Sequence, residues 1–522
     1  MEQTAALLSR GVRRPRFLSA TAFALMLAAC GGGEDGSLSA SREADLGAGS
    51  CSSRSNATTA LLLECVTLEG VRAHQAALQA IATANNNTRV SGSPGYDQSA
   101  AYAEKVFRDA GYLVTRQEFQ FETFVSLSPS VLEQTAPVFA TIPHAIMSYS
   151  GSGDVTAAVS TPSGDPRGCS AADFAGFPAG NIALIGRGAP DGFPVACTFA
   201  LKATNAYNAG ATAVVIYNNA PGPLNGTLGA TFTLDIGAVG VEQSMGAQLA
   251  ATPGLVMHVK TDTLRGTATT SNILAESRDG DANNVVMVGA HLDSVNAGPG
   301  INDNGSGSAA ILETAKQMAK VKPRNKLRFA LWGAEESNLV GSTYYVTHLT
   351  DAQKSQIALY LNFDMIGSPN HAFFIYDGDD SDAVGAGPGP AGSGQIEKTF
   401  EKFFSDRGLP FQGTDFSGRS DYGPFIAAGI PAGGLFTGAE GIKTAEQAAI
   451  FGGTAGVAFD PCYHQACDTF ANNSSEALSV NSDAVAYATL QFAMNTSAVN
   501  SVRGKGNFKM PILPPEPEPA AQ

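Results

Sequence analysis

Three apolar segments of this chain have the length and composition of buried β-strands, and each ends at or just before a residue that can bind metal. The segments are VVMVGA at 285–290, LRFALW at 327–332 and IALYLNF at 357–363. Such runs are typical of strands that are covered on both faces. Open α/β sheets place ligand sites at the carboxyl ends of their strands. The pattern therefore predicts an α/β fold with three layers, in which a mixed, mostly parallel sheet lies between helices.

Carboxylates and histidines follow these segments. His291 comes directly after the first, Glu335 and Glu336 follow a Gly-Ala step after the second, and Asp364 comes directly after the third. Asp303 lies in the loop GINDNGSGS, whose glycines and asparagines tolerate tight turns and whose serines are expected to cap the helix AAILETAKQMAK.

This combination of side chains suits two zinc ions. Two adjacent dications need several anionic ligands, and neutral imidazoles favour zinc over magnesium or calcium. One carboxylate must bridge the two ions. The candidate ligands are His291, Asp303, Glu336, Asp364 and His464.

Glu335 has a different expected role. Neighbouring residues on a short turn point to different sides, so Glu335 is the natural general base for a water molecule that attacks a carbonyl. Each motif alone is weak: a Glu-Glu pair is more often a solvated turn, and Asp364 alone fits a buried, hydrogen-bonded carboxylate equally well. The ordered combination favours the metal site.

The segments that carry these residues resemble secreted bacterial leucyl aminopeptidases with two zinc ions, a family related to glutamate carboxypeptidases and glutaminyl cyclases. The resemblance extends over about residues 62–500. Its motifs are GAHLDS, GINDNGSG, WGAEE, NFDMIG, SGRSDYGPF and PCYHQACD.

The resemblance implies a role for each ligand. His291 and Asp364 would bind one zinc, Glu336 and His464 the other, and Asp303 would bridge them.

The resemblance also implies roles beside the metals. Tyr463 would donate a hydrogen bond to the tetrahedral oxyanion, although a packed core tyrosine is the alternative. Asp293 would accept a hydrogen bond from His291 and fix its tautomer. Arg419 matches a position near the substrate or forms a surface ion pair, and Asp421 orients a neighbour or belongs to a turn.

The implied activity is hydrolysis of an N-terminal, apolar residue from peptides. A carboxypeptidase or dipeptidase on the same metal site is the alternative within enzymes, because metal ligands do not choose the chain end. Glutaminyl cyclisation is less favoured because that branch uses one zinc. A non-catalytic surface binding module is the alternative outside enzymes, and the intact Glu335 argues against it.

The domain organisation follows from an interruption of the peptidase pattern. A zinc-peptidase domain is expected at 61–125 and 270–500, with an insertion at 126–269. Within the insertion, NIALIGRG, the helix TFALKATNAYNAG and the strand TAVVIYNN resemble a protease-associated (PA) domain, which would act as a lid or an access element. An unrelated structural insertion is the alternative.

The N-terminal residues indicate export. Residues 1–30 combine an arginine-rich start with an apolar stretch too short to remain as a membrane span, which predicts a signal peptide. The end LAAC-GGG resembles a lipobox, so Cys30 would be lipidated and would anchor the protein to the outer membrane or cell surface. Cleavage as an ordinary signal peptide is the alternative. Residues 31–60 are expected to be a flexible tether, and 501–522 a proline-rich extended tail.

Cysteine usage and charge agree with an exported enzyme. Six of the seven cysteines remain without Cys30, and an even number suits an oxidising compartment. Soft metal ligation by Cys462 and Cys467 is the competing interpretation. A net charge of -15 disfavours nucleic acid as a partner. Proximity predicts the disulfides Cys51–Cys65, Cys169–Cys197 and Cys462–Cys467.

Overall fold

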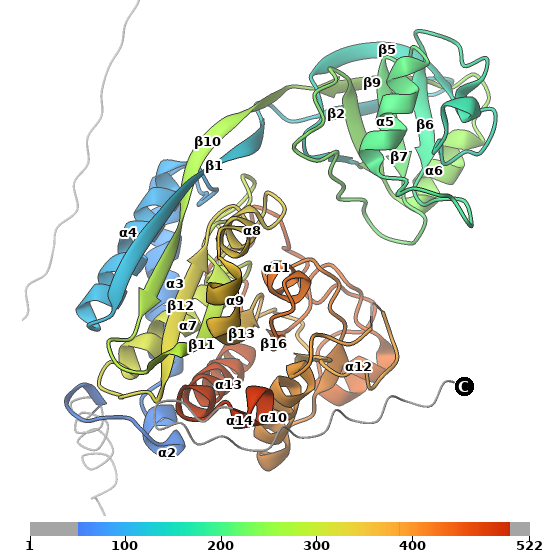
Figure 1. The fold of residues 1–522 in the computed structure, drawn as a ribbon. Helices are drawn as coiled ribbons and strands as arrows, with labels where there is room; N and C mark the ends of the chain where they lie inside the picture. The colour runs from blue at the N-terminus through green and yellow to red at the C-terminus, as the bar shows by residue number, and fades with distance from the viewer. Residues whose placement is uncertain (1–50, 386, 502–522) are drawn as a thin grey trace, which may run out of the picture. The chain divides into compact units, whose positions relative to one another are not determined.

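The computed structural model describes residues 51–385 and 387–501 (Figure 1). Their strands form two eight-stranded sheets, each of which belongs to one module. The core module holds the candidate ligands, and the inserted module comprises the chain between β1 and β10.

The core sheet has the order β1-β10-β12-β11-β13-β16-β14-β15. Its central neighbours β12, β11, β13 and β16 are parallel, as are β14 and β15, whereas β1, β10 and the β14–β16 pair are antiparallel. The predicted mixed α/β sheet is thus confirmed. The strands are β1 (Leu113–Ser126), β10 (Thr263–Glu276), β11 (Asp281–His291), β12 (Asn325–Trp332), β13 (Ile357–Phe363), β14 (Phe374–Tyr376), β15 (Gln412–Thr414) and β16 (Ala432–Phe436).

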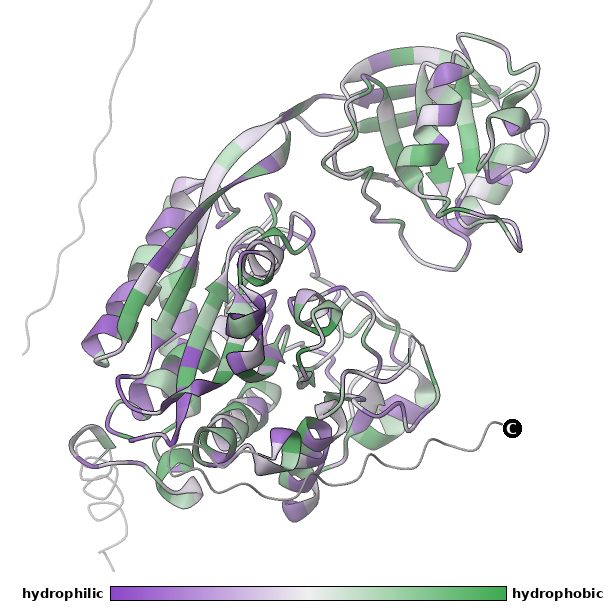
Figure 2. Ribbon diagram, viewed as in Figure 1, coloured by the Kyte–Doolittle hydropathy of each residue, from purple (hydrophilic) through white to green (hydrophobic). Residues whose placement is uncertain are grey.

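Helices cover both faces of this sheet (Figure 1). Side chains alternate along β11: Val286 and Val288 join one apolar cluster, whereas Val285 and Met287 join another. The first cluster includes residues of α3, α4, α7, α10 and α13, and the second includes residues of α8 and α11. Figure 2 shows hydrophobic strands flanked by helices with hydrophilic outer faces. Burial on both faces explains why the strand sequences are almost continuously apolar.

The helices of the core module are short to medium in length. They are α2 (Thr59–Leu63), α3 (Leu68–Ala84), α4 (Pro94–Asp109), α7 (Gly305–Gln317), α8 (Val340–Thr347), α9 (Asp351–Gln356), α10 (Ser393–Asp406), α11 (Tyr422–Ala427), α12 (Ala445–Phe451), α13 (Ser475–Met494) and α14 (Ser497–Asn500). None of the helices in the described part of the chain has the length and apolar character needed to cross a bilayer.

The start of α7 differs from the prediction. The N-cap is Asn304, whose side chain accepts a hydrogen bond from the main-chain N–H of Gly307 at 2.9 Å. Ser306 and Ser308 lie inside the first turn, where their hydroxyls donate to the carbonyls of Asn302 and His291. The predicted serine cap is therefore wrong, and the serines instead hold the ligand-bearing loop.

The inserted module contains the second sheet, of order β3-β2-β9-β5-β6-β7-β8-β4. The predicted elements of this region are present as β6, α5 and β7, and β6, β7 and β8 are parallel. Its elements are β2 (Val131–Ala136), β3 (Ala140–Thr141), β4 (Ala145–Ile146), β5 (Gly153–Ser160), β6 (Ile182–Gly186), α5 (Phe199–Asn208), β7 (Ala213–Tyr217), β8 (Gly237–Val241), α6 (Gln243–Ala250) and β9 (Val256–Thr261).

The strands β1 and β10 connect the two modules. They pair along their whole length, from Leu113 opposite Glu276 to Ser126 opposite Thr263. Only the end of β10, Ile273–Glu276, also pairs with β12. The sequence pattern of the peptidase resumes at residue 270. The strand β10 begins earlier, at Thr263, because its pairing with β1 extends beyond that motif.

All three predicted disulfides are present: Cys51–Cys65, Cys169–Cys197 and Cys462–Cys467. Residues 51–60, expected to belong to a tether, contact the core module: Asn56 donates to the carbonyl of Gln317 at 2.8 Å. The expected signal peptide, Cys30, the tether up to residue 50 and the tail from residue 502 lie outside the described residues.

Candidate metal site

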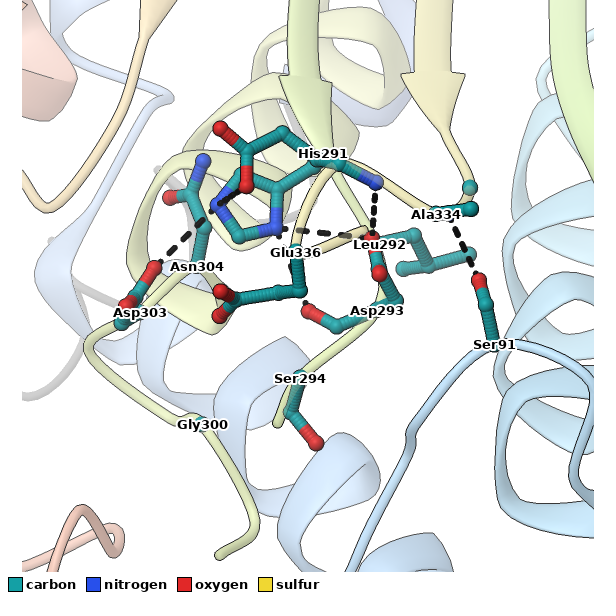
Figure 3. A network of polar contacts seen from close by, with 12 residues as sticks. Ser91, His291, Leu292, Asp293, Ser294, Gly300, Asp303, Asn304, Ala334 and Glu336 are labelled. Atoms are coloured by element: carbon teal, nitrogen blue, oxygen red, sulfur yellow. Dashed lines mark hydrogen bonds and ion pairs between the residues drawn. The ribbon is translucent and has the colours of Figure 1, made fainter. Parts of the chain in front are cut away.

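The predicted ligands converge at the carboxyl ends of the central parallel strands. His291 is the last residue of β11, Asp364 follows β13 directly, and Glu336 follows β12 across a short turn. Asp303 precedes α7, and His464 comes from the loop before α13. Figure 3 shows His291, Asp303 and Glu336 close together on their different segments. The structure therefore brings together residues that are far apart in the sequence.

Asp303 lies between two groups of potential ligands. Its Oδ1 is 3.2 Å from Nε2 of His291, which is also 3.3 Å from Oδ1 of Asp364. Its Oδ2 is 3.3 Å from Nε2 of His464, which is also 3.0 Å from Oε2 of Glu336. Each carboxylate oxygen thus faces a different histidine. This is the arrangement that a carboxylate bridging two ions requires.

Two carboxylate oxygens of the candidate ligands have the environment that is expected beside a cation. Oε1 of Glu336 and Oδ1 of Asp364 are buried and have no hydrogen-bond partner among residues 51–385 and 387–501. A buried carboxylate oxygen without a donor is costly, whereas a metal ion would satisfy it. Carboxylate oxygens and imidazole nitrogens are ligands that Zn²⁺ takes in proteins. The donor set therefore fits zinc.

The charges around His464 also favour a cation at the site. Burial lowers the pKa of His464, but Glu336 and Asp303 outweigh burial and raise that pKa to about 10. The carboxylates thus favour a positive charge at this position. A divalent cation would take the place of the proton.

Glu335 lies within reach of His291 and Glu336 but belongs to neither of the two groups that share Asp303. Its Oε2 is 3.8 Å from Nε2 of His291. Burial, together with the charges of Asp421, Asp364 and Glu336, raises the pKa of Glu335 well above its usual value, against the opposing effect of His291. A buried carboxylate with a raised pKa is suited to accept and return a proton.

Two ligands are held by residues that the sequence analysis did not single out. Ser420 donates to Oδ2 of Asp364 at 2.6 Å and accepts from Asn362 at 2.9 Å. Asp468 accepts from the main-chain N–H groups of Asn302 and Asp303 at 2.8 and 2.9 Å. Asp468 directly follows Cys467 in the PCYHQACD motif, and this position was its only signal in the sequence.

Asp293 is next to His291, as expected, but its closest contact is different. Nδ1 of His291 is 3.2 Å from the main-chain oxygen of Asp293 and 3.6 Å from its carboxylate. The carboxylate oxygen Oδ1 accepts instead from the N–H of Glu335 at 3.3 Å. Asp293 thereby links the β11 ligand to the turn that carries the candidate base.

Tyr463 and Arg419 lie together at the site. The ring of Tyr463 stacks on that of His464, with 3.8 Å between the centroids, and its hydroxyl accepts from Arg419 at 3.2 Å. Arg419 also donates to Glu440 at 2.8 Å. Burial and the charges of Asp303 and Glu336 raise the pKa of Tyr463 well above its usual value, so its hydroxyl remains a donor at neutral pH.

Asp421 is fully buried at the start of α11. Both of its carboxylate oxygens lack a hydrogen-bond partner among the described residues. Burial, with help from Asp364 and Asp293, raises its pKa to about 8.

Backbone conformations at the site are unusual. Ala334, Met365 and His464 have φ values of 54°, 48° and 57°, in the left-handed region that non-glycine residues rarely adopt. The first immediately precedes Glu335, the second follows Asp364, and the third is a ligand itself. The N–H of Ala334 donates to Ser91 at 2.7 Å, which holds this turn (Figure 3). Such residues concentrate at functional sites because the surrounding structure must hold them in place.

A pocket lies over the site, with an empty volume of about 540 Å³ that includes open solvent. Its lining includes Glu335 and all the candidate ligands except His291. Apolar and aromatic side chains also line it: Met365, Tyr376, Tyr422, Phe436 and Ala439. The ligand set, the candidate base and the pocket together define a metal-dependent hydrolase. The pocket has room for a side chain of the substrate.

Comparisons with known proteins agree with this class. Residues 272–489 match the model of peptidase family M28, and residues 152–249 match the PA domain. An aminopeptidase from Pseudomonas aeruginosa strain PAO1 is 46% identical over 455 residues, which cover 84% of this chain and 83% of that protein. Leucine aminopeptidase 2 from Trichophyton rubrum is 49% identical over 332 residues, which cover 62% and 65% of the two chains. The chain belongs to peptidase family M28 and carries a PA domain.

Solved structures show the same relationship. An aminopeptidase from Aneurinibacillus sp. strain AM-1 aligns with a TM-score of 0.65 at 30% identity, covering 83% of this chain and 96% of that one. A zinc aminopeptidase from Bacillus subtilis aligns with a TM-score of 0.58 at 26% identity, covering 81% and 95%.

Proposed function

The protein is a zinc aminopeptidase, and we propose that it uses two zinc ions and removes an apolar N-terminal residue from peptides. The observation that carries the proposal is the position of Asp303 between two ligand groups. His291 and Asp364 complete one group, and Glu336 and His464 the other. Bound zinc supplies Lewis acidity, which polarises the scissile carbonyl and makes water a better nucleophile at neutral pH.

The residues of the chain supply the remaining steps. Glu335 takes the proton from the attacking water and returns it to the leaving amine, which its position beside the ligands supports. Tyr463 donates a hydrogen bond to the oxygen on which negative charge develops. Asp293 and Ser420 hold the turn of Glu335 and the ligand Asp364 in place.

The preference for the amino end of a peptide is supported by relatives that are named aminopeptidases, and not by the charges that line the pocket. The lining includes five carboxylates and one guanidinium, and that guanidinium, of Arg419, is ion-paired with Glu440 at 2.8 Å. Two bound zinc ions would offset four of these negative charges, so the net charge of the lining does not choose between an amine and a carboxylate. The five carboxylates are Asp303, Glu335, Glu336, Asp364 and Asp415.

The side chain of the first residue would meet an apolar wall. Met365, Tyr376 and Phe436 line the pocket beside the ligands. Burial of a leucine-sized side chain against such a wall contributes about 1.5–3 kcal/mol. The name leucine aminopeptidase of the Trichophyton rubrum relative is consistent with this preference.

The proposal is tested by metal analysis of the purified protein together with a substrate panel. The panel contains leucyl, lysyl and glutamyl amides and an N-blocked peptide with a free carboxyl end. About two zinc ions per chain, and cleavage of the leucyl amide but not of the blocked peptide, are expected. Cleavage of the blocked peptide would instead establish the carboxypeptidase alternative, and an inert zinc-loaded protein would favour the binding module.

Replacing Tyr463 by Phe is expected to lower kcat by about 10²-fold, because one donor to the developing oxyanion is lost. KM should change little, since the substrate carbonyl in the ground state needs this donor less. Steady-state kinetics on a leucyl amide measure both values. Tyr112→Phe is the control, because its hydroxyl donates to the carbonyl of Ala315 outside the pocket. An unchanged kcat for Tyr463→Phe would exclude the role.

We also propose that the protein is an exported lipoprotein of the cell envelope that is attached to the membrane through Cys30 alone. The support is the sequence of residues 1–30, which lie outside the described structure. Cys30→Ala is expected to move the protein from the membrane to the soluble fraction, because the acyl chains are lost. Fractionation followed by immunoblotting measures this, and persistent membrane association of the variant would contradict lipid anchoring.

A further inference from the structure

Arg89 is a fully buried cation behind the metal site that has no part in the proposed chemistry. It lies between α3 and α4, far in sequence from the ligands. Burial lowers the pKa of its guanidinium to about 10, opposed by the charges of Asp293, Asp468 and Asp303, so the group stays protonated at neutral pH. A buried charge is expensive unless the fold uses it.

All three of its side-chain hydrogen bonds go to main-chain carbonyl oxygens of one segment. Nε donates to Pro299 at 2.8 Å, Nη2 donates to Gly300 at 2.5 Å, and Nη1 donates to Leu292. These carbonyls belong to the loop that begins at His291 and ends at Asp303. The guanidinium therefore joins the start of this loop to its end.

The main chain of Arg89 holds the same loop. Its N–H donates to Oγ of Ser294 at 2.9 Å, and that hydroxyl donates to the carbonyl of Gly298 at 2.9 Å. Figure 3 shows Leu292, Ser294 and Gly300 on the segment between the two ligands. The loop is thus fixed at several points by one residue.

The space around Gly300 shows how closely the loop is packed. A Cβ at this position would lie 2.3 Å from the carbonyl oxygen of Asp303 and 3.2 Å from Nη2 of Arg89. The carbonyl of Gly300 also accepts from the N–H of Gly305 at the start of α7. The main chain at Gly300 thus contacts the guanidinium of Arg89 and leaves no space for a side chain beside Asp303.

We propose that Arg89 is a positioning residue that sets the separation of His291 and Asp303, and thereby the affinity of the site for zinc. The proposal rests on the proposed function, since it assumes that these two residues are ligands. An arginine is needed because its planar, branched group presents donors in three directions at once. A lysine places its donors on a single nitrogen and cannot span the three carbonyls in the same way.

The experiment measures zinc affinity in Arg89→Met and Arg89→Lys. The full-length protein is stripped of metal with a chelator, and zinc is titrated in competition with a chromophoric chelator. Arg89→Met is expected to bind zinc about 100-fold more weakly and Arg89→Lys about 10-fold more weakly, which is the range for residues that orient ligands. kcat at saturating zinc and thermal unfolding of the metal-free protein are measured in parallel.

Lys202→Met is the matched control. Lys202 is likewise fully buried and donates to the main-chain carbonyls of Arg167 and Gly188 at 2.5 and 2.7 Å, but in the inserted module. Its loss should reduce thermal stability and leave zinc affinity unchanged. This contrast separates a general cost of removing a buried cation from an effect on the site.

A folded Arg89→Lys or Arg89→Met protein that binds zinc as tightly as the wild type would overturn the proposal. If Arg89→Met does not fold, Arg89→Lys alone decides. Failure of the proposed function has a different signature. If the metal site is misassigned, the wild-type protein binds no zinc in the same titration. If only the reaction is misassigned, the wild type binds zinc but does not cleave the leucyl amide in the substrate panel.

Discussion

Replacing Glu335 by Gln is expected to lower kcat by about 10²-fold or more, with zinc binding retained. The amide has almost the same shape but cannot take a proton from water. Glu335 lies within reach of His291 and Glu336 but belongs to neither of the two groups that share Asp303, so the metal should remain. Turnover of a leucyl amide and zinc content are measured on the same preparation.

Glu336→Gln is the matched control, because it makes the same chemical change on the adjacent residue of the same turn. Its Oε2 is 3.0 Å from His464, so this variant is expected to lose zinc affinity as well as activity. The two variants should therefore differ in metal content even though both lose turnover. A fully active Glu335→Gln enzyme would remove Glu335 from the mechanism.

Replacing Asp303 by Ala is expected to abolish binding of both zinc ions together with activity. The carboxylate has one oxygen facing each histidine, at 3.2 and 3.3 Å, so its loss affects both groups of ligands. It also leaves two nearby histidines without the main anion between them. Zinc titration by metal analysis and competition measures the stoichiometry and the affinity.

Asp364→Ala provides the comparison for this prediction. Asp364 belongs to the group of His291 and not to that of His464, so one zinc should be lost and the other retained. A protein with Asp303→Ala that still holds two zinc ions at wild-type affinity would exclude bridging. Loss of both zinc ions in both variants would show that the two ions bind only together.

The sequence was informative where local pattern and chemistry coincide. The strands before His291 and Asp364 are apolar because they are covered on both faces, and this pattern is visible in the residues themselves. Ligands that directly follow such strands were therefore predictable, as were disulfides between neighbouring cysteines.

The residues that hold the ligands in place could not be predicted, because their contacts join segments that are distant in the sequence. Arg89 has no distinctive neighbours in sequence, and its partners at 292–300 become apparent only in the folded chain. Ser420 meets Asp364 across the sheet edge, and no periodicity reveals such a pair. The cap of α7 was mispredicted because the amide of Asn304 competes with the following serines, and only geometry decides between them.

The register of β1 and β10 indicates that the core module does not depend on the inserted module for its strand pairing. Ser126 lies opposite Thr263, so the inserted module occupies the place that a tight reverse turn would occupy in a simple hairpin. The entropy of closing such a loop grows only slowly with its length, so a whole domain can be accepted there at little cost to the remaining fold. A chain shortened by joining 126 to 263 through a two-residue turn would keep every pair of that ladder. The core module is therefore expected to fold without the inserted module.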